Sequence, residues 1–520
     1  MKNLFRNAGA DIPASIVVFL VALPLCLGVA VASDAAPVTG IVAGIIGGIV
    51  IGALSGSQLS VSGPAAGLTA IVAGAIGKLD SYSVFLLSVV LAGGLQLLFG
   101  FLKAGMIGEF IPNAVIKGML AAIGLILILK QLPHFVGYDA DPEGDETFIQ
   151  PDNQNTFSEL LNAFNYISAG AIIIALIATA ILLVYETKTI KQQRIFQLIP
   201  GPLIVVAAGI GVNQLFLQSF PQFALSGDHL VKLDVFDKPT DFVAALPSPS
   251  FAGITNAQVW ITAITLAIVA SLETLLSIEA VDKIDPQKRI SPTNRELKAQ
   301  GVGNIVSGML GGLPVTSVIV RSSANVSAGA KSKLSSIMHG ILLMLSVLFF
   351  ADYLNLIPKA SLAAILIFTG YKLAKIKLFT EHYRKGWDQF LPFIITVIAI
   401  LLSDLLIGIL IGMVVGMYFV LRSNFKSAIF FIKDEHRYLI RFRKEVSFLN
   451  KALMKGILES IPDGTSVLVD ATKSDFIDRD IIDMVNDFII NAETRGIKVY
   501  IKFSNAASKT FFHDNKMVID

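Results

Sequence analysis

The chain has 520 residues, of which 54% are hydrophobic and 15% are charged, and its net charge is +2. Soluble domains carry about 25% charged residues, so the lipid bilayer is expected to be the solvent for most of this chain. The small net charge argues against a nucleic-acid partner, and a single cysteine, Cys26, excludes an intrachain disulfide and a cysteine-based metal cluster.

Apolar segments follow one another from residue 13 to residue 421, and the composition becomes charged and mixed from about Arg422. A full crossing needs about 20 residues, and several segments are shorter, as in transporters whose helices break at the bilayer midplane. The first segment is predicted to be a span rather than a signal peptide, because no cleavage site follows it. The predicted spans are 13–32, 37–54, 60–77, 84–102, 111–129, 167–184, 199–217, 257–277, 300–312, 314–329, 335–350, 358–373, 391–403 and 404–421.

Basic residues predict the orientation of these spans. An even number of spans puts both termini on one side, and Lys and Arg flank the first and the last span. The predicted loops 185–198, 281–299 and 374–388 lie on that same side and are rich in Lys and Arg, whereas the loop 131–166 has none. We therefore predict a multi-pass protein of a bacterial-type inner membrane with both termini in the cytoplasm.

Proline motifs indicate an internal repeat. Pro64 and Pro314 open two short spans, and Pro112 and Pro358 open the next spans but one, at nearly equal offsets. Seven spans separate the copies, and this odd number predicts halves of opposite orientation, about 10–217 and about 257–422, with substrate at their interface. Chance recurrence of Pro-x-Ala in a chain rich in small residues is the alternative.

The two broken spans predict an anion site. The stretch from Ser60 to Gly67 is expected to be extended and then helical, with Pro64 at the first helical position and free N–H groups at Ala65, Ala66 and Gly67. The stretch from Gly311 to Asn325 is expected to change in the same way and supplies hydroxyls and Arg321. Two facing helix N-termini beside an arginine favour an anion site. The alternative is a pair of packing seams made of small residues.

Glu273 lies well inside an apolar span, where an ionisable side chain predicts a functional site. Ser277 follows one turn later on the same helix face. The alternative is a protonated carboxyl with a structural hydrogen bond. No phosphate-binding loop or paired metal-ligand pattern is present, so the sequence does not predict an enzyme.

The C-terminal part predicts a small α/β domain over 435–520. Strand patterns at 466–470 and 498–503 flank an amphipathic helix at 481–488, which gives a β-α-β order.

The chain resembles the SulP family of anion transporters, called solute carrier family 26 in animals, over nearly its whole length. The resemblance is carried by Ala22-Leu23-Pro24, Ser62-Gly63-Pro64, Gly303-Asn304, Arg321-Ser322 and the run 328–335. It implies fourteen transmembrane segments in a seven-plus-seven inverted repeat, with core and gate subdomains that move like an elevator. It also implies a homodimer in membrane lipid and a C-terminal STAS domain that could bind a regulatory partner.

The resemblance also implies residue roles. An anion site is implied at Leu25, Val29, Gly63, Pro64, Ala65, Ala66, Val320, Arg321 and Ser322. Glu273 is implied to line the same pocket. From the residues themselves, we predict a cation-coupling site at which Glu273 takes up a proton or holds Na⁺ with Ser277 and the hydroxyl of Thr316 or Ser317. The chain departs from relatives in three places: Ala65 replaces an aromatic residue, Val320 replaces a serine, and Asp478-Arg479-Asp480 replaces the phosphorylated Asp-Ser-Ser-Gly of other STAS domains.

These patterns leave three kinds of transporter open. The favoured one is a cation-coupled symporter of a small inorganic anion, with bicarbonate preferred over sulfate. An anion channel or uncoupled exchanger is the second. A carrier of organic acids or nucleobases is the third, although Ala65, Val29 and Val320 offer few hydrogen-bonding groups for such substrates. No cofactor is predicted apart from Na⁺ as the coupling ion.

Overall fold

The computed structural model describes residues 4–79, 81–139, 148, 155–187, 190, 193, 199–233, 235 and 238–502. The predicted loops 131–166 and 185–198 lie partly outside the described residues, and everything beyond residue 502 lies outside them. The chain divides into two compact units, Met1–Val414 and Val415–Asp520, which are described separately.

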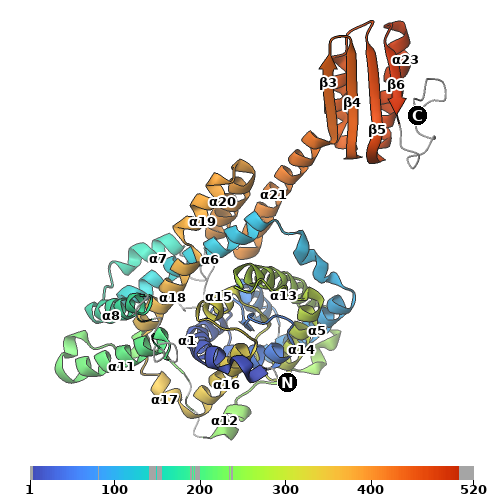
Figure 1. Ribbon diagram of the computed structural model, residues 1–520. Coiled ribbons are helices and arrows are strands. Elements are labelled where there is room, and N and C mark those ends of the chain that lie inside the picture. The colour runs from blue at the N-terminus through green and yellow to red at the C-terminus, as the bar shows by residue number, and fades with distance from the viewer. Residues whose placement is uncertain are drawn as a thin grey trace. The chain divides into compact units, whose positions relative to one another are not determined.

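Helices make up almost all of the first unit (Figure 1). The first half contains α1 (Ala8–Ala32), α2 (Pro37–Ile46), α3 (Gly52–Leu54), α4 (Thr69–Ile76), α5 (Tyr82–Phe101), α6 (Asn113–Val136), α7 (Thr156–Ala163), α8 (Ala169–Tyr185), α11 (Gly201–Ser219) and α12 (Pro239–Ala244). The second half contains α13 (Ala257–Ile284), α14 (Thr293–Met309), α15 (Ile319–Ser327), α16 (Leu334–Phe349), α17 (Ala351–Leu354), α18 (Lys359–Leu373), α19 (Ile376–Arg384), α20 (Trp387–Leu402) and α21 (Leu405–Ala428), the last of which continues into the second unit. Two short strands, β1 (Ser62–Pro64) and β2 (Val315–Ser317), interrupt the helices.

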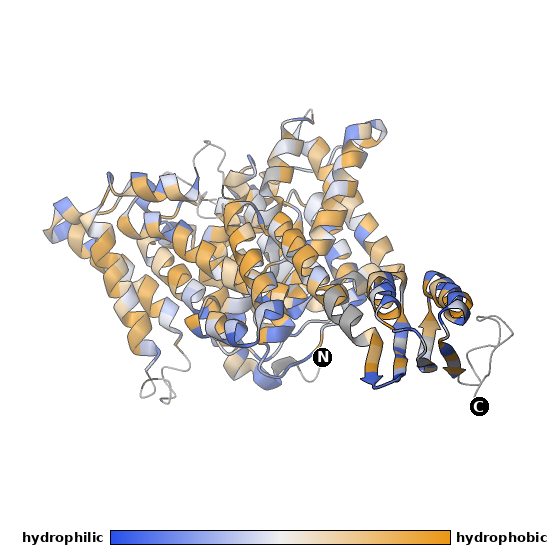
Figure 2. Ribbon diagram, turned by 90° about the horizontal axis from the view of Figure 1, so that it is seen from above, coloured by the Kyte–Doolittle hydropathy of each residue, from blue (hydrophilic) through white to orange (hydrophobic). Residues whose placement is uncertain are grey.

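Every predicted span contains helix, and the helices are largely hydrophobic along their length (Figure 2). Within the described residues, six helical stretches are long and apolar enough to cross a membrane. They are α1, the continuous stretch Pro37–Leu54, α5, α6, α11 and α13. The count of fourteen crossings stays a prediction, because several of the other helices are shorter.

The predicted span 300–312 differs from the observed helix at both ends. α14 already begins at Thr293 and ends at Met309. Its sequence carries more polar residues than the other long helices, and it packs against α5 instead of standing alone in lipid. The two backbones meet at Gly93 and Gly301: a Cβ on Gly301 would lie 2.7 Å from the Gly93 carbonyl oxygen. This close contact explains how a polar helix lies inside the unit.

The helices of the first unit pack in two groups (Figure 1). In the first, which we call the ribbon group, α5 packs on α13 and α14, and α1 packs on α2, α15 and α16; α4 also belongs here. In the second, which we call the flank group, α6 packs on α18 and α20, and α8 packs on α11 and α18. Pro112 and Pro358 are the N-cap residues of α6 and α18, in line with the repeat seen in the sequence.

The second unit contains a four-stranded sheet in the order β3-β4-β5-β6, with helices α22 (Lys451–Glu459) and α23 (Arg479–Thr494). The strands are β3 (Ile429–Asp434), β4 (Arg437–Val446), β5 (Ser466–Ile477) and β6 (Lys498–Lys502). β3 and β4 form an antiparallel hairpin, whereas β5 runs parallel to both β4 and β6. The predicted β-α-β order is confirmed, and the sheet begins at Ile429, ahead of the expected residue 435.

Candidate functional site

The centre of the ribbon group is a short antiparallel pairing of β1 and β2, the extended parts of the two broken spans. We call this pair of strands the ribbon. β1 pairs with β2 so that Ser62 lies opposite Ser317, Gly63 opposite Thr316 and Pro64 opposite Val315. β2 leads through Val318 directly into α15. The predicted change from extended chain to helix is therefore confirmed in both spans, and the two strands meet in opposite directions, as an inverted repeat requires.

The predicted position of Pro64 at the start of a helix is wrong. Pro64 belongs to β1, and Ala65 is still extended, with φ −114° and ψ 136°. A 3-10 turn covers Ala66–Leu68, and the α-helix begins only at Thr69. Pairing with β2 keeps the backbone extended through Pro64, so helical dihedral angles begin two residues later than the sequence suggested.

Arg321 lies in the first turn of α15 and is fully buried. Its Nη2 donates to the Pro64 carbonyl oxygen at 3.4 Å, while Nε and Nη1 have no hydrogen-bond partner among the described residues. Gly63 leaves room for the guanidinium, because a Cβ there would lie 1.8 Å from Nη1. Burying a charged group with unpaired donors is costly. A guanidinium in this state is suited to an anion that accepts from those donors.

The neighbouring hydroxyl groups mostly hold the ribbon together. Ser322 Oγ accepts from the Val61 N–H at 2.9 Å and donates to the Val318 carbonyl oxygen. Ser317 Oγ lies 2.6 Å from Ser60 Oγ. Because side chains alternate along a strand, Thr316 points to the opposite face of the ribbon from Ser317. One small ion therefore cannot meet both hydroxyls from the same side.

Glu273 lies in α13 and is buried beside the turn that follows β1. A Cβ on Gly67 would lie 3.0 Å from Glu273 Oε1, so the carboxyl rests against the backbone of that turn. Ser277, one helical turn further on, is also buried. The contact between α13 and β2 is made by Thr274, whose Oγ1 accepts from the Ser317 N–H at 3.3 Å. Thr274 was not predicted from the sequence.

The remaining predicted residues are apolar and buried around the ribbon. Leu25 and Val320 belong to one hydrophobic cluster, and Val29 and Ala65 to another. Ala66 is half-buried against the second cluster. The structure thus places α1 beside both broken spans.

A polar row on α14 holds the ribbon in place, and the sequence reasoning missed most of it. Gln300 Nε2 donates to Ser62 Oγ at 2.8 Å, which anchors β1. Asn304 accepts from the Val315 N–H at 2.6 Å and donates to the Val315 carbonyl oxygen at 2.9 Å, which anchors β2. Glu296, a turn before Gln300, accepts from Ser55 Oγ at 2.5 Å. The spacing of four residues between Glu296, Gln300 and Asn304 was the available signal.

Comparisons with known proteins agree with this architecture. The model of the sulfate permease family matches residues 9–399. YvdB of Bacillus subtilis is 29% identical over 400 residues, which cover 75% of this chain and 70% of that protein. The bicarbonate transporter BicA of Picosynechococcus sp. is 25% identical over 380 residues, which cover 71% of this chain and 62% of that protein. The murine anion transporter Slc26a9 in its inward-facing state has a similar fold, with a TM-score of 0.66 at 16% identity over 95% of this chain and 85% of that chain.

The fold and the ribbon thus define a helical membrane protein in which two interrupted helical segments pair through short strands. Since the family model matches about three quarters of its length, the chain belongs to the sulfate permease family of membrane anion transporters, also known as SulP or solute carrier family 26. Members of this family are transporters and not enzymes.

Proposed function

We propose that this protein is a secondary transporter that carries a small inorganic oxyanion, preferably bicarbonate and next sulfate, together with Na⁺ or H⁺. The single observation that carries the proposal is Arg321, a fully buried cation beside the Gly63–Pro64 backbone whose Nε and Nη1 have no partner among the described residues. An oxyanion accepts from such donors and removes the cost of leaving them unpaired.

The preference for bicarbonate rests on charge and on likeness. One buried arginine balances one negative charge, which suits a monovalent anion better than sulfate. The similarity to BicA, a bicarbonate transporter, points in the same direction. The family's own description names sulfate, so sulfate is the second candidate.

Coupling to a cation is proposed for Glu273. The inside-negative membrane potential opposes entry of an anion by about 2.3 kcal/mol per charge and 100 mV. A cation that travels with a monovalent anion cancels this cost. Glu273 is a buried carboxyl next to the turn after β1, and this burial supports the proposal. In the proposal, Glu273 takes up a proton or holds Na⁺ with Ser277 and the hydroxyl of Thr316 or Ser317.

The two helix groups suggest the movement. In the proposed elevator, the ribbon group is the core that carries the anion and the flank group is the gate against which it slides. We further propose a homodimer with both termini in the cytoplasm and a STAS-like second unit, on the basis of the family membership and the basic loops.

The test is uptake of labelled bicarbonate into vesicles that contain the purified protein, with unlabelled sulfate, chloride and small organic acids as competitors. Saturable uptake inhibited first by bicarbonate and next by sulfate is the expected result. Uptake that does not saturate would replace the carrier with a channel. Preferential inhibition by organic acids would replace the substrate class.

Glu273→Gln tests the coupling. The amide keeps the shape of the carboxyl but cannot bind a proton or neutralise Na⁺, so we expect anion binding to survive while cation-driven accumulation is lost. Glu279→Gln is the matched control, because Glu279 lies on the same helix but pairs with Lys283 at 3.0 Å near the helix end. Unchanged dependence on pH and Na⁺ in Glu273→Gln would make Glu273 a structural residue.

A further inference from the structure

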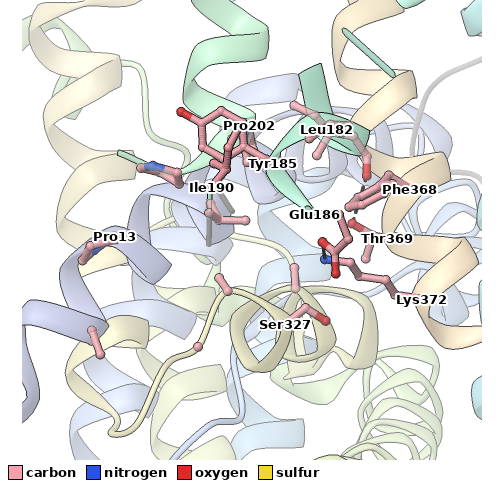
Figure 3. A pocket seen from close by; sticks show the side chains of 18 of the residues that line it. Pro13, Leu182, Tyr185, Glu186, Ile190, Pro202, Ser327, Phe368, Thr369 and Lys372 are labelled. Atoms are coloured by element: carbon pink, nitrogen blue, oxygen red, sulfur yellow. Dashed lines mark hydrogen bonds and ion pairs between the residues drawn. The ribbon is translucent and has the colours of Figure 1, made fainter. Parts of the chain in front are cut away.

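A cavity of about 370 Å³ lies between the two helix groups (Figure 3). One wall comes from the ribbon group, through Pro13 and Val17 of α1 and Ser327 at the end of α15. The opposite wall comes from the flank group, through the last turn of α8, the first turn of α11 and the last turns of α18. The cavity therefore opens where the two groups face each other, at the end of the membrane unit at which α1 begins.

The cavity lies in line with the ribbon. Val17 and Leu25 are separated by eight residues of α1, a rise of about 12 Å. α15 likewise has Arg321 in its first turn and Ser327 in its last. Between these levels, α1 carries the buried apolar Val21, whereas α15 carries the buried Ser322, Ser323 and Asn325. The cavity and the candidate anion site are thus at two levels along the same pair of helices, separated by buried side chains of both helices.

Two charged side chains line this cavity. Lys372 of α18 and Glu186, the residue that caps α8, are the only charged residues among the described ones that line it. Their Nζ and Oε2 atoms are 3.2 Å apart, and the side chains are 25% and 43% exposed, so both still reach water. Figure 3 shows the two side chains pointing toward one another on the wall that the flank group forms. Lys372 also lies over the Phe368 ring, at 4.5 Å from its centroid.

We propose that this cavity is a waiting site for the transported anion and that Lys372 is the residue that holds the anion there, in competition with Glu186. The inference rests on the proposed transport of an anion. An ammonium group is a compact point charge that exchanges one carboxylate or oxyanion partner for another without a fixed geometry. An anion that enters the cavity takes over part of the interaction of Lys372 with Glu186. The pair therefore sets the affinity from this side of the membrane alone.

The pair predicts changes of opposite sign. Lys372→Gln removes the only cation among the described lining residues and should raise the half-saturating anion concentration on the side where α1 begins, by about two- to fivefold, the range for one partly exposed charge interaction. Glu186→Gln removes the competitor and should lower it by a similar factor. Lys372→Arg keeps the charge and should stay near wild type. Half-saturation from the opposite side should not change in any of the three variants.

The experiment measures exchange of labelled anion in vesicles in which all proteins face one way, with the anion varied on one side at a time. Lys375→Gln is the control, because Lys375 is an exposed lysine just beyond α18 that does not line the cavity. If wild type carries no anion, the proposed function itself fails. If wild type transports and Lys372→Gln either changes nothing or lowers transport equally from both sides, Lys372 is structural and the waiting site is refuted. The same sign of change in Lys372→Gln and Glu186→Gln would also refute it.

Discussion

Gly63 and Arg321 depend on each other at the centre of the protein. The guanidinium occupies the space that a side chain on Gly63 would need. Gly44 of α2 contributes to the same space, because a Cβ there would lie 2.6 Å from Cys26 Sγ and 3.8 Å from Arg321 Nη1. Glycine at these positions is therefore explained by the close approach of a buried arginine rather than by flexibility.

This dependence gives a prediction for two variants. Arg321→Gln removes the buried charge and should weaken anion binding about tenfold to a hundredfold, the range for charge-assisted hydrogen bonds. Gly63→Ala should have a similar effect, because its methyl group displaces the guanidinium. Binding can be followed as the shift of the thermal unfolding midpoint with anion concentration. Gly74→Ala is the control, since no described atom lies within 4 Å of a Cβ at Gly74. Normal binding in both Gly63→Ala and Arg321→Gln would contradict the assignment of the anion site.

A second residue-scale feature lies at the other end of the flank group, after α6. The Asp139 carboxyl lies between two imidazoles, with His134 Nδ1 at 2.7 Å from Oδ1 and His229 Nδ1 at 2.6 Å from Oδ2. Burial by itself would raise the pKa of the Asp139 carboxyl. The hydrogen bonds from His134 and His229 outweigh burial and lower this pKa to about 2. The hydrogen bond to Asp139 raises the pKa of His229. Partial burial and the charge of Lys359 lower this pKa, and the charge of Asp228 raises it, so that the net shift is upward.

These shifts predict how stability depends on pH. The pKa of His229 is above its unfolded value of about 6.5, so its contribution is complete below that pH and is lost as pH rises through the folded pKa. Asp139 contributes above about pH 4 and loses its contribution as pH falls toward 2. We expect the unfolding midpoint of wild type to fall between pH 6 and pH 8 by more than that of His229→Gln. Equal slopes in the two proteins would show that this pair does not set the pH response.

At the residue scale, the buried charged residues of the candidate site could be anticipated better than the hydrogen bonds of its polar residues. Arg321 and Glu273 could be predicted, because an ionisable side chain inside an apolar segment is costly and needs a reason. The roles of Ser322 and Ser317 could not, because a hydroxyl bonds to whatever the fold brings near it. In this fold the partners are Val61 and Ser60, more than 250 positions away in the chain.

At the scale of elements, the sequence predicted where spans break but not how the broken ends pair. Pro64 and Pro314 mark the breaks. The ribbon itself forms because the polar row on α14 supplies Asn304 to bind both the N–H and the carbonyl group of Val315. That pairing holds the chain extended, and it explains why helix α4 begins later than predicted.

Close helix contacts in the flank group give an element-scale prediction. Gly124 of α6 and Gly370 of α18 bring the two backbones together, since a Cβ on Gly124 would lie 2.6 Å from the Gly370 carbonyl oxygen. The obstacle is backbone, which cannot move aside as a side chain can. Gly124→Ala should therefore destabilise the protein by about 1–3 kcal/mol, the cost of overpacking. Gly211→Ala in α11 is the control, because no described atom lies within 4 Å of its Cβ position. Equal unfolding midpoints for the two variants would contradict the tight α6–α18 contact.

At the scale of the whole molecule, the sequence anticipated two units because the charge content changes near Arg422. It did not anticipate the β3–β4 hairpin or α22. The signal was present: two apolar runs flank Asp434-Glu435, and Glu435 has the left-handed φ of 42° that a tight turn requires. In the structure, α21 continues without interruption to Ala428, directly before β3.

The two units also make a prediction about independence. The ribbon, Arg321 and Glu273 all lie in the first unit, and the second unit has its own hydrophobic core, which includes Ile440, Phe442, Val467 and Val485. A chain that ends at Ala428 keeps every residue of the candidate site and loses only the sheet and its helices. We expect this truncated protein to bind the anion with an affinity within about twofold of wild type, because no site residue belongs to the removed part.

Transport rate, expression and dimer content can still change, since a regulatory or assembly role is proposed for the second unit. The measurement is the anion-dependent shift of the unfolding midpoint, taken alongside the mass of the purified protein in mild detergent. A truncated protein that folds but shows no such shift would place part of the anion site in the second unit and contradict the assignment to the ribbon.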